Sequence, residues 1–170
     1  VMPTLYSFPP IAGNQAKILI LGSMPGEASL AAKQYYAHRR NAFWPIMTQW
    51  LHIDAHASYE EKVSALQSSP IALWDVLKSC KRVGSLDSMI ETGTQTGNDF
   101  SSFFSTHRKI THVFFNGGTA EASFKRYVLP GSGLDLTFAR LPSTSPANAR
   151  LSFDDKCRTW HEMLHSAVKS

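Results

Sequence analysis

The chain has 170 residues, of which 43% are hydrophobic and 18% charged, and its net charge is +4. This composition excludes a disordered or fibrous protein and suffices for the core of one domain, residues 1–170. No apolar run is long enough to span a membrane and no signal peptide is evident, so we expect no membrane partner. The two cysteines, Cys80 and Cys157, make neither a disulfide framework nor a metal cluster, so we expect a protein of the reducing cytoplasm, in a bacterial cytosol or nucleoid. The slight positive charge is weak support for a polyanionic partner.

Short apolar runs that alternate with amphipathic stretches predict an α/β fold. In chain order we expect a strand at 17–21, helices at 41–51 and 58–67, a strand at 70–74, a loop at 84–98, a helix at 99–107, a strand at 112–115, a helix at 119–127, a strand at 134–140 and a helix at 153–168. Ser58 and Ser152 are well placed to cap the helices that they precede. The alternation indicates three layers, with a central, mostly parallel four-stranded sheet flanked by helices.

Polar loops follow the predicted strands. In an open parallel sheet, ligands bind at the edge where the carboxyl ends of the strands meet. Four segments should come together at that edge, namely 22–41, 75–82, 116–119 and 141–150. A binding site is therefore expected there.

The first of these loops combines a tight turn with aromatic and basic residues. It opens with GSMPG at 22–26, whose glycines permit close backbone approach, although neither a P-loop nor a dinucleotide fingerprint follows. It ends in YYAHRRNAFW at 35–44. Arg39 and Arg40 suit contacts with phosphates, and the neighbouring rings suit stacking on bases. Asn41 is also a candidate N-cap for the helix that it opens.

The other loops add a carboxylate, an amide and several hydroxyl groups. Asp75 ends a predicted strand, where capping of a turn is an equally good explanation. Asn116 precedes two glycines at a helix start, an arrangement that favours anion binding. The segment LPSTSPANAR at 141–150 is stiffened by proline and ends in Arg150, which suits phosphate contact, although a plain surface loop would have the same features.

Five segments, taken in chain order, resemble the motifs of the uracil-DNA glycosylase superfamily, most closely its hypoxanthine (deoxyinosine) branch. These segments are GSMPG, YYAHRRNAFW, ALWDVL, FFNGGTA and LPSTSPANAR. The resemblance runs from about Lys17 to the last helix. It implies a monofunctional enzyme that flips a deaminated base out of DNA and hydrolyses its N-glycosidic bond. Hypoxanthine is the implied base, and uracil, as in the mismatch-specific branch, is the alternative. The implied partner is double- or single-stranded DNA, the enzyme is expected to be a monomer, and the scheme requires no cofactor and no metal.

The resemblance also implies roles for individual residues. Tyr36 would stack on the flipped base, and the Asp75 carboxylate would accept a hydrogen bond from its polar edge. The remaining residues fall into two groups that contact either the base or the DNA backbone. The base pocket would include Gly22, Ser23, Met24 and Asn116, and the backbone would be held by Arg39, Arg40, Ser143, Thr144, Ser145, Asn148 and Arg150.

Two positions depart from the pattern of the superfamily. Met24 stands where many relatives carry a water-activating Asn or Asp, and a thioether cannot polarise water. The hypoxanthine branch implies that Asn41 has this catalytic role, and His38 is the next candidate. The missing activator also leaves open a DNA-binding module without catalysis. Ala147 stands where relatives often place a bulky wedge, for which Asn148 or Arg150 could substitute.

Overall fold

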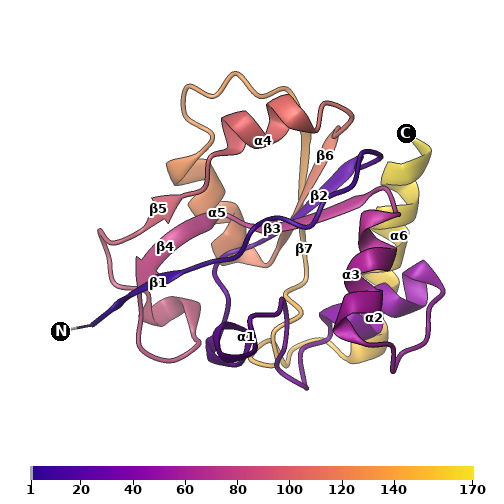
Figure 1. Ribbon diagram of the computed structural model, residues 1–170, viewed down its shortest axis with the longest axis horizontal. Helices are drawn as coiled ribbons and strands as arrows, with labels where there is room; N and C mark the ends of the chain where they lie inside the picture. Colours follow the sequence, from indigo (N-terminus) through magenta and orange to yellow (C-terminus); the bar gives the residue numbers. More distant parts are fainter. Residues whose placement is uncertain (1) are drawn as a thin grey trace.

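The computed structural model describes residues 2–170, which form three layers around a parallel sheet (Figure 1). The neighbouring strands of this sheet are, in spatial order, β3 (Ile71–Asp75), β2 (Ile18–Gly22), β6 (His112–Asn116) and β7 (Thr137–Leu141). All three pairs are parallel. The predicted α/β class and the four-stranded parallel sheet are therefore confirmed.

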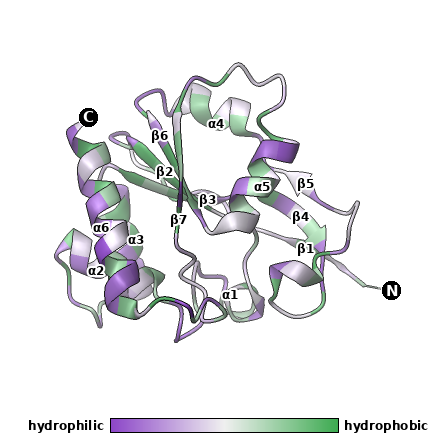
Figure 2. Cartoon of the chain, turned by 180° about the vertical axis from the view of Figure 1, so that it is seen from behind, coloured by the Kyte–Doolittle hydropathy of each residue, from purple (hydrophilic) through white to green (hydrophobic). Residues whose placement is uncertain are grey.

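Alternation along β2 explains why the sheet has two covered faces. Ile18 and Ile20 belong to the core on one face, whereas Leu19 and Leu21 belong to the core on the other. The first face is covered by α2 (Phe43–Leu51), α3 (Tyr59–Gln67) and α6 (Phe153–Lys169), and the second by α4 (Phe100–Thr106) and α5 (Gly118–Tyr127). Figure 2 shows the resulting apolar strands in green between the helical layers.

Two of the predicted helix caps are present. Ser58 Oγ accepts a hydrogen bond from the Glu61 amide, and Ser152 Oγ accepts one from the Asp155 amide, each at 3.1 Å. Each bond satisfies an amide that the first turn of a helix leaves without a partner. Within residues 2–170, no helix is both long and apolar enough to cross a membrane.

A second, antiparallel sheet was not predicted. The chain continues from β3 into β4 (Leu77–Lys81), which pairs with β1 (Thr4–Tyr6) and β5 (Thr96–Gly97). The prediction of a loop at 75–82 is therefore wrong. The predicted loop at 84–98 likewise contains β5 and a 3₁₀ turn, η1 (Asp87–Met89). Strands β1 and β5 have only three and two residues, and polar residues interrupt the apolar pattern of β4 at Lys78, Ser79 and Lys81. They are specified by partners distant in the chain rather than by a local pattern.

Other boundaries also differ from the prediction. Strand β7 begins at Thr137 rather than at residue 134, because Thr137 pairs with His112, the first residue of β6. A short helix, α1 (Glu27–Ala32), interrupts the loop that follows β2. Helix α2 begins at Phe43 with Ala42 as its N-cap, so the prediction that Asn41 is the N-cap is wrong.

Candidate functional site

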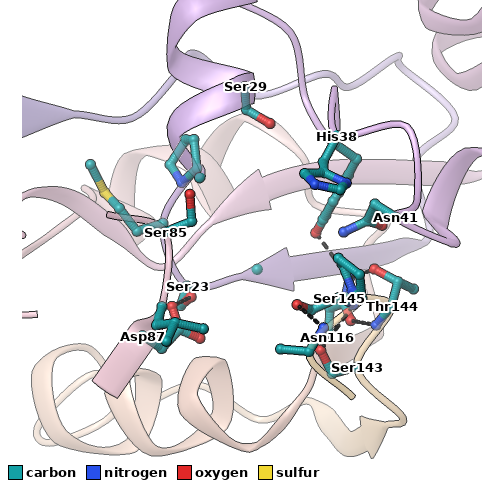
Figure 3. A pocket seen from close by; sticks show the side chains of 18 of the residues that line it. Ser23, Ser29, His38, Asn41, Ser85, Asp87, Asn116, Ser143, Thr144 and Ser145 are labelled. Atoms are coloured by element: carbon teal, nitrogen blue, oxygen red, sulfur yellow. Dashed lines mark hydrogen bonds between the residues drawn. The ribbon is translucent and has the colours of Figure 1, made fainter. Parts of the chain in front are cut away.

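A cavity of about 750 Å³ opens at the carboxyl edge of the parallel sheet. Asp75 and Asn116, at the ends of β3 and β6, line it together with residues from the segments that follow β2 and β7. The predicted convergence of these segments is therefore observed. A wall at 85–88, which sequence reasoning missed, completes the cavity. In Figure 3, Ser23, Ser85 and Asp87 lie on one side, and His38, Asn41, Ser143 and Ser145 lie on the other.

Gly22 allows two polar side chains to meet at one point of the cavity. A Cβ atom at this position would lie 2.6 Å from Asp75 Oδ1 and 2.9 Å from the Tyr36 hydroxyl oxygen. Gly22 is also paired with Asp75 in the register of β2 and β3. Any side chain here would displace the carboxyl group or the phenol, so the glycine is needed for close approach and not for an unusual backbone angle.

Tyr36 is held in a strained but well-supported position. Its φ angle is +54°, in the left-handed region that large side chains rarely adopt. Its ring stacks on Phe43 with centroids 4.2 Å apart and an interplanar angle of 23°. Burial, followed by the nearby Asp75 carboxylate, raises the pKa of the Tyr36 phenol above its ordinary value. The hydroxyl group therefore keeps its proton at neutral pH.

Asn116 connects three walls of the cavity. Its Nδ2 donates to the Tyr36 hydroxyl at 3.1 Å and to Thr144 Oγ1 at 2.9 Å, and its Oδ1 accepts from the Thr144 amide at 2.9 Å. The Thr144 carbonyl in turn accepts from the Ala42 amide at 3.0 Å. Both amide hydrogens of Asn116 are thus used within the protein, which fixes the loops after β2 and β7 relative to each other.

Asp75 is a buried carboxyl group that titrates near neutrality. It is 4% exposed, and among residues 2–170 its Oδ2 atom has no hydrogen-bond partner. Burial raises the pKa of Asp75 to about 7; the Asp87 carboxylate raises it further, and the Arg82 guanidinium opposes both. Asp75 can therefore accept a hydrogen bond when ionised and donate one when protonated.

Arg82 and Asp87 form a support that sequence reasoning missed. The buried Arg82 donates from Nε to the Gly84 carbonyl at 2.7 Å and from Nη2 to the Pro25 carbonyl at 2.6 Å. Ser23 Oγ donates to Asp87 Oδ1 at 2.7 Å. These bonds join the GSMPG turn to the wall at 85–88. An arginine in a predicted polar loop has no local signal for burial, so only the spatial arrangement identifies it.

Asn41 lies at the cavity, where among residues 2–170 only the oxygen of its side-chain amide has a hydrogen-bond partner. Its Oδ1 accepts from the Phe43 amide at 2.9 Å, so it stabilises the start of α2 from outside the helix. Its amide group lines the cavity beside His38 (Figure 3). His38 Nδ1 accepts from the Arg40 amide at 3.1 Å. The segment before α2 therefore presents both polar side chains at the cavity.

The remaining predicted residues divide between the cavity and its surroundings. Ser23, Met24, Ser143, Thr144, Ser145 and Asn148 line the cavity, whereas the exposed Arg39, Arg40 and Arg150 lie outside its lining in the described chain. Asn148 Nδ2 donates to the Ser143 carbonyl at 3.1 Å, and the buried Lys156 donates to the Asn148 carbonyl at 2.6 Å. Helix α6 thus braces this loop through Lys156, a residue that sequence reasoning missed. Within residues 2–170, no group of His, Cys, Asp and Glu side chains is arranged to hold a metal ion.

The cavity combines an aromatic ring, a buried carboxyl group and rims rich in hydroxyl groups, which suit a planar polar ligand attached to a phosphate backbone. The family model of the uracil DNA glycosylase superfamily matches residues 9–164. A protein of Methanosarcina acetivorans named hypoxanthine DNA glycosylase is 36% identical over 146 residues, which are 85% of this chain and 89% of the relative. A protein of Methanosarcina barkeri with the same name is 37% identical over 111 residues, which are 65% of this chain and 69% of the relative.

The fold comparison agrees. The solution NMR structure of a protein from Methanosarcina acetivorans, described as a candidate uracil DNA glycosylase, has a TM-score of 0.80 to this chain. It is 32% identical, and the match covers 97% of this chain and 99% of that one. This chain therefore belongs to the uracil DNA glycosylase superfamily.

Proposed function

We propose that this protein is a DNA glycosylase that excises deaminated bases, with hypoxanthine as its main substrate. The observation that carries the proposal is the convergence of Tyr36 and Asp75 over Gly22, at the floor of a cavity in a chain of this superfamily. Its volume of about 750 Å³ is within the range of ligand pockets and has room for a flipped nucleotide. The names of the two relatives favour hypoxanthine over uracil.

Tyr36 and Asp75 would hold the flipped base. Phe43 covers one face of the Tyr36 ring, so the opposite face is the one that can stack on a base. Such stacking contributes about 1–3 kcal/mol per base. An ionised Asp75 would accept the N1–H of hypoxanthine, which adenine lacks, and Asn116 would keep Tyr36 in position through its bond to the hydroxyl group. This pairing would make the pocket selective for the deaminated purine.

Asn41 would place the attacking water. Cleavage passes through a sugar with oxocarbenium character, which a well-placed water can attack without a strong base. The water oxygen bonds to C1′ as the C1′–N bond breaks, one proton leaves to solvent, and the base departs with the bonding electrons and takes up a proton. An amide can orient this water by donating and accepting hydrogen bonds, whereas the buried thioether of Met24 cannot polarise it.

The rims of the cavity would hold the DNA. Exposed Arg39, Arg40 and Arg150 would neutralise phosphates, and Ser143, Ser145 and Asn148 would donate or accept hydrogen bonds beside the flipped nucleotide. We propose that residues 1–170 act as one domain, as a monomer in the cytoplasm, on double- or single-stranded DNA.

The test is base release from defined DNA. Duplexes and single strands carrying hypoxanthine, uracil or xanthine would be incubated with the protein, and abasic sites would be revealed by alkaline cleavage. We expect cleavage at hypoxanthine first, with an undamaged duplex as the control. Salt-dependent DNA binding without release of any base would instead show a DNA-binding module without catalysis.

A further inference from the structure

The wall of the cavity that sequence reasoning missed carries an unusual apolar loop. Six large apolar side chains are exposed within residues 2–170, and three of them, Val83, Leu86 and Met89, lie in the segment 83–90, with exposures of 61%, 54% and 54%. This segment contains no Lys or Arg. Unlike the segment at 39–40, it therefore offers no cation to a phosphate, and its exposed surface is suited to an apolar contact.

Leu86 lies in the middle of this segment, on a backbone that is anchored on both sides. The preceding residue, Ser85, accepts a hydrogen bond at Oγ from the Glu27 amide at 2.8 Å, and the following residue, Asp87, accepts one from Ser23 at 2.7 Å. The base of the loop is fixed by buried Arg82 through the Gly84 carbonyl. The exposure of Leu86 is thus a property of a well-supported loop and not of a free segment.

Leu86 also differs from its two apolar neighbours by its position. Leu86 lines the cavity, whereas Val83 and Met89 lie outside its lining in the described chain. Figure 3 shows Ser85 and Asp87, the residues on either side of Leu86, across the cavity from Ser143 and Ser145. A strand whose backbone rests on the Ser143 side would therefore have Leu86 beside the place that a nucleotide leaves when it enters the cavity.

We infer that Leu86 inserts into the base stack of duplex DNA at the gap left by the flipped nucleotide and so keeps that nucleotide in the cavity. Proteins that unstack base steps commonly insert an apolar side chain such as leucine. Ala147, on the opposite rim, carries only a methyl group and cannot fill such a gap. The inference rests on the proposed function, because the gap exists only if a nucleotide is flipped.

The experiment compares variants in single-turnover base release from a hypoxanthine duplex. Leu86→Ala should release the base at least about tenfold more slowly than the wild type, because no inserted side chain then offsets the cost of unstacking the bases. A pyrene nucleotide opposite the hypoxanthine fills the stack by itself and should restore most of the lost rate. Met89→Ala, an equally exposed residue of the same loop, and Leu151→Ala, an exposed leucine outside the cavity, should behave like the wild type with either duplex.

Each other outcome overturns the inference. A wild-type rate in Leu86→Ala, or a loss that pyrene does not restore, would show that Leu86 does not fill the stack. A pyrene-restored loss in Leu151→Ala alone would make Leu151, outside the cavity, the inserted side chain. Failure of the wild type to release any base would instead contradict the proposed function, so the two failures are distinguishable.

Discussion

Replacement of Asn41 by alanine and by serine separates the proposed catalytic amide from a structural one. Asn41 Oδ1 accepts from the Phe43 amide at 2.9 Å, and Phe43 is fully buried at the start of α2. Alanine removes this acceptor together with the rest of the amide group. A serine hydroxyl can still accept from an amide two residues on, but it cannot replace the amide that would orient the water.

The structural and the catalytic contributions of the Asn41 side chain differ in size, and the two variants lose them to different extents. Loss of a helix-start acceptor costs about 1 kcal/mol of unfolding free energy, and less of this is lost with serine. For a chain of this length, Asn41→Ala should lower the melting temperature by about 2–4 °C. If the amide places the water, both variants should lose about a hundredfold in base release, which corresponds to about 2.7 kcal/mol.

The assay is single-turnover base release from a hypoxanthine duplex at saturating enzyme, with calorimetric melting and duplex binding measured in parallel. We expect Asn41→Ala and Asn41→Ser to share the loss of rate, to differ in melting temperature and to bind the duplex nearly as well as the wild type. Wild-type release by Asn41→Ser would refute the catalytic role, because the only function left to the side chain would be support of α2. His38, on the same wall, would then be the next candidate.

Three further results are expected. Because burial raises the pKa of Asp75 from 3.8 to about 7, the folded protein retains a proton that the unfolded chain loses, and the stability of the wild type therefore falls as the pH rises through that range. Urea unfolding at several pH values should show that Asp75→Asn lacks this decline, and equal pH profiles of the two proteins would contradict the raised pKa. Gly22→Ala should greatly slow base release while the sheet still folds, since its Cβ would lie 2.6 Å from Asp75 Oδ1 and 2.9 Å from the Tyr36 hydroxyl; a variant with unchanged rate would show that neither group contacts the base. Arg39→Ala and Arg40→Ala should each reduce the salt slope of duplex binding by about one unit, and an unchanged slope would remove that residue from the phosphate contacts.

The sequence by itself determined the parallel sheet and the location of the site. Buried strands such as β2 and β6 are continuous apolar runs between helical patterns, and this signal is local to each segment. Since the carboxyl ends of parallel strands share one edge, the convergence of Asp75, Asn116 and the GSMPG turn followed from the order of the elements. The resemblance to a family was needed to assign roles to Tyr36, Asn41 and the segment at 141–150. Their local sequence alone is equally compatible with ordinary turns and caps.

Only the tertiary structure decided how the cavity is supported and what forms its far wall. Strand β4 has β1 and β5 as partners, and the hydrogen bond between Ser23 and Asp87 joins residues 64 positions apart. Arg82 appears in the sequence as one more basic residue of a polar loop, yet its guanidinium is buried against the carbonyls of Pro25 and Gly84. The burial of Arg82 and of Asp75, and the raised pKa that its own burial gives to Asp75, depend on every segment packed around these two groups. Local periodicity records only which side of its own element a residue faces, so it cannot contain that information.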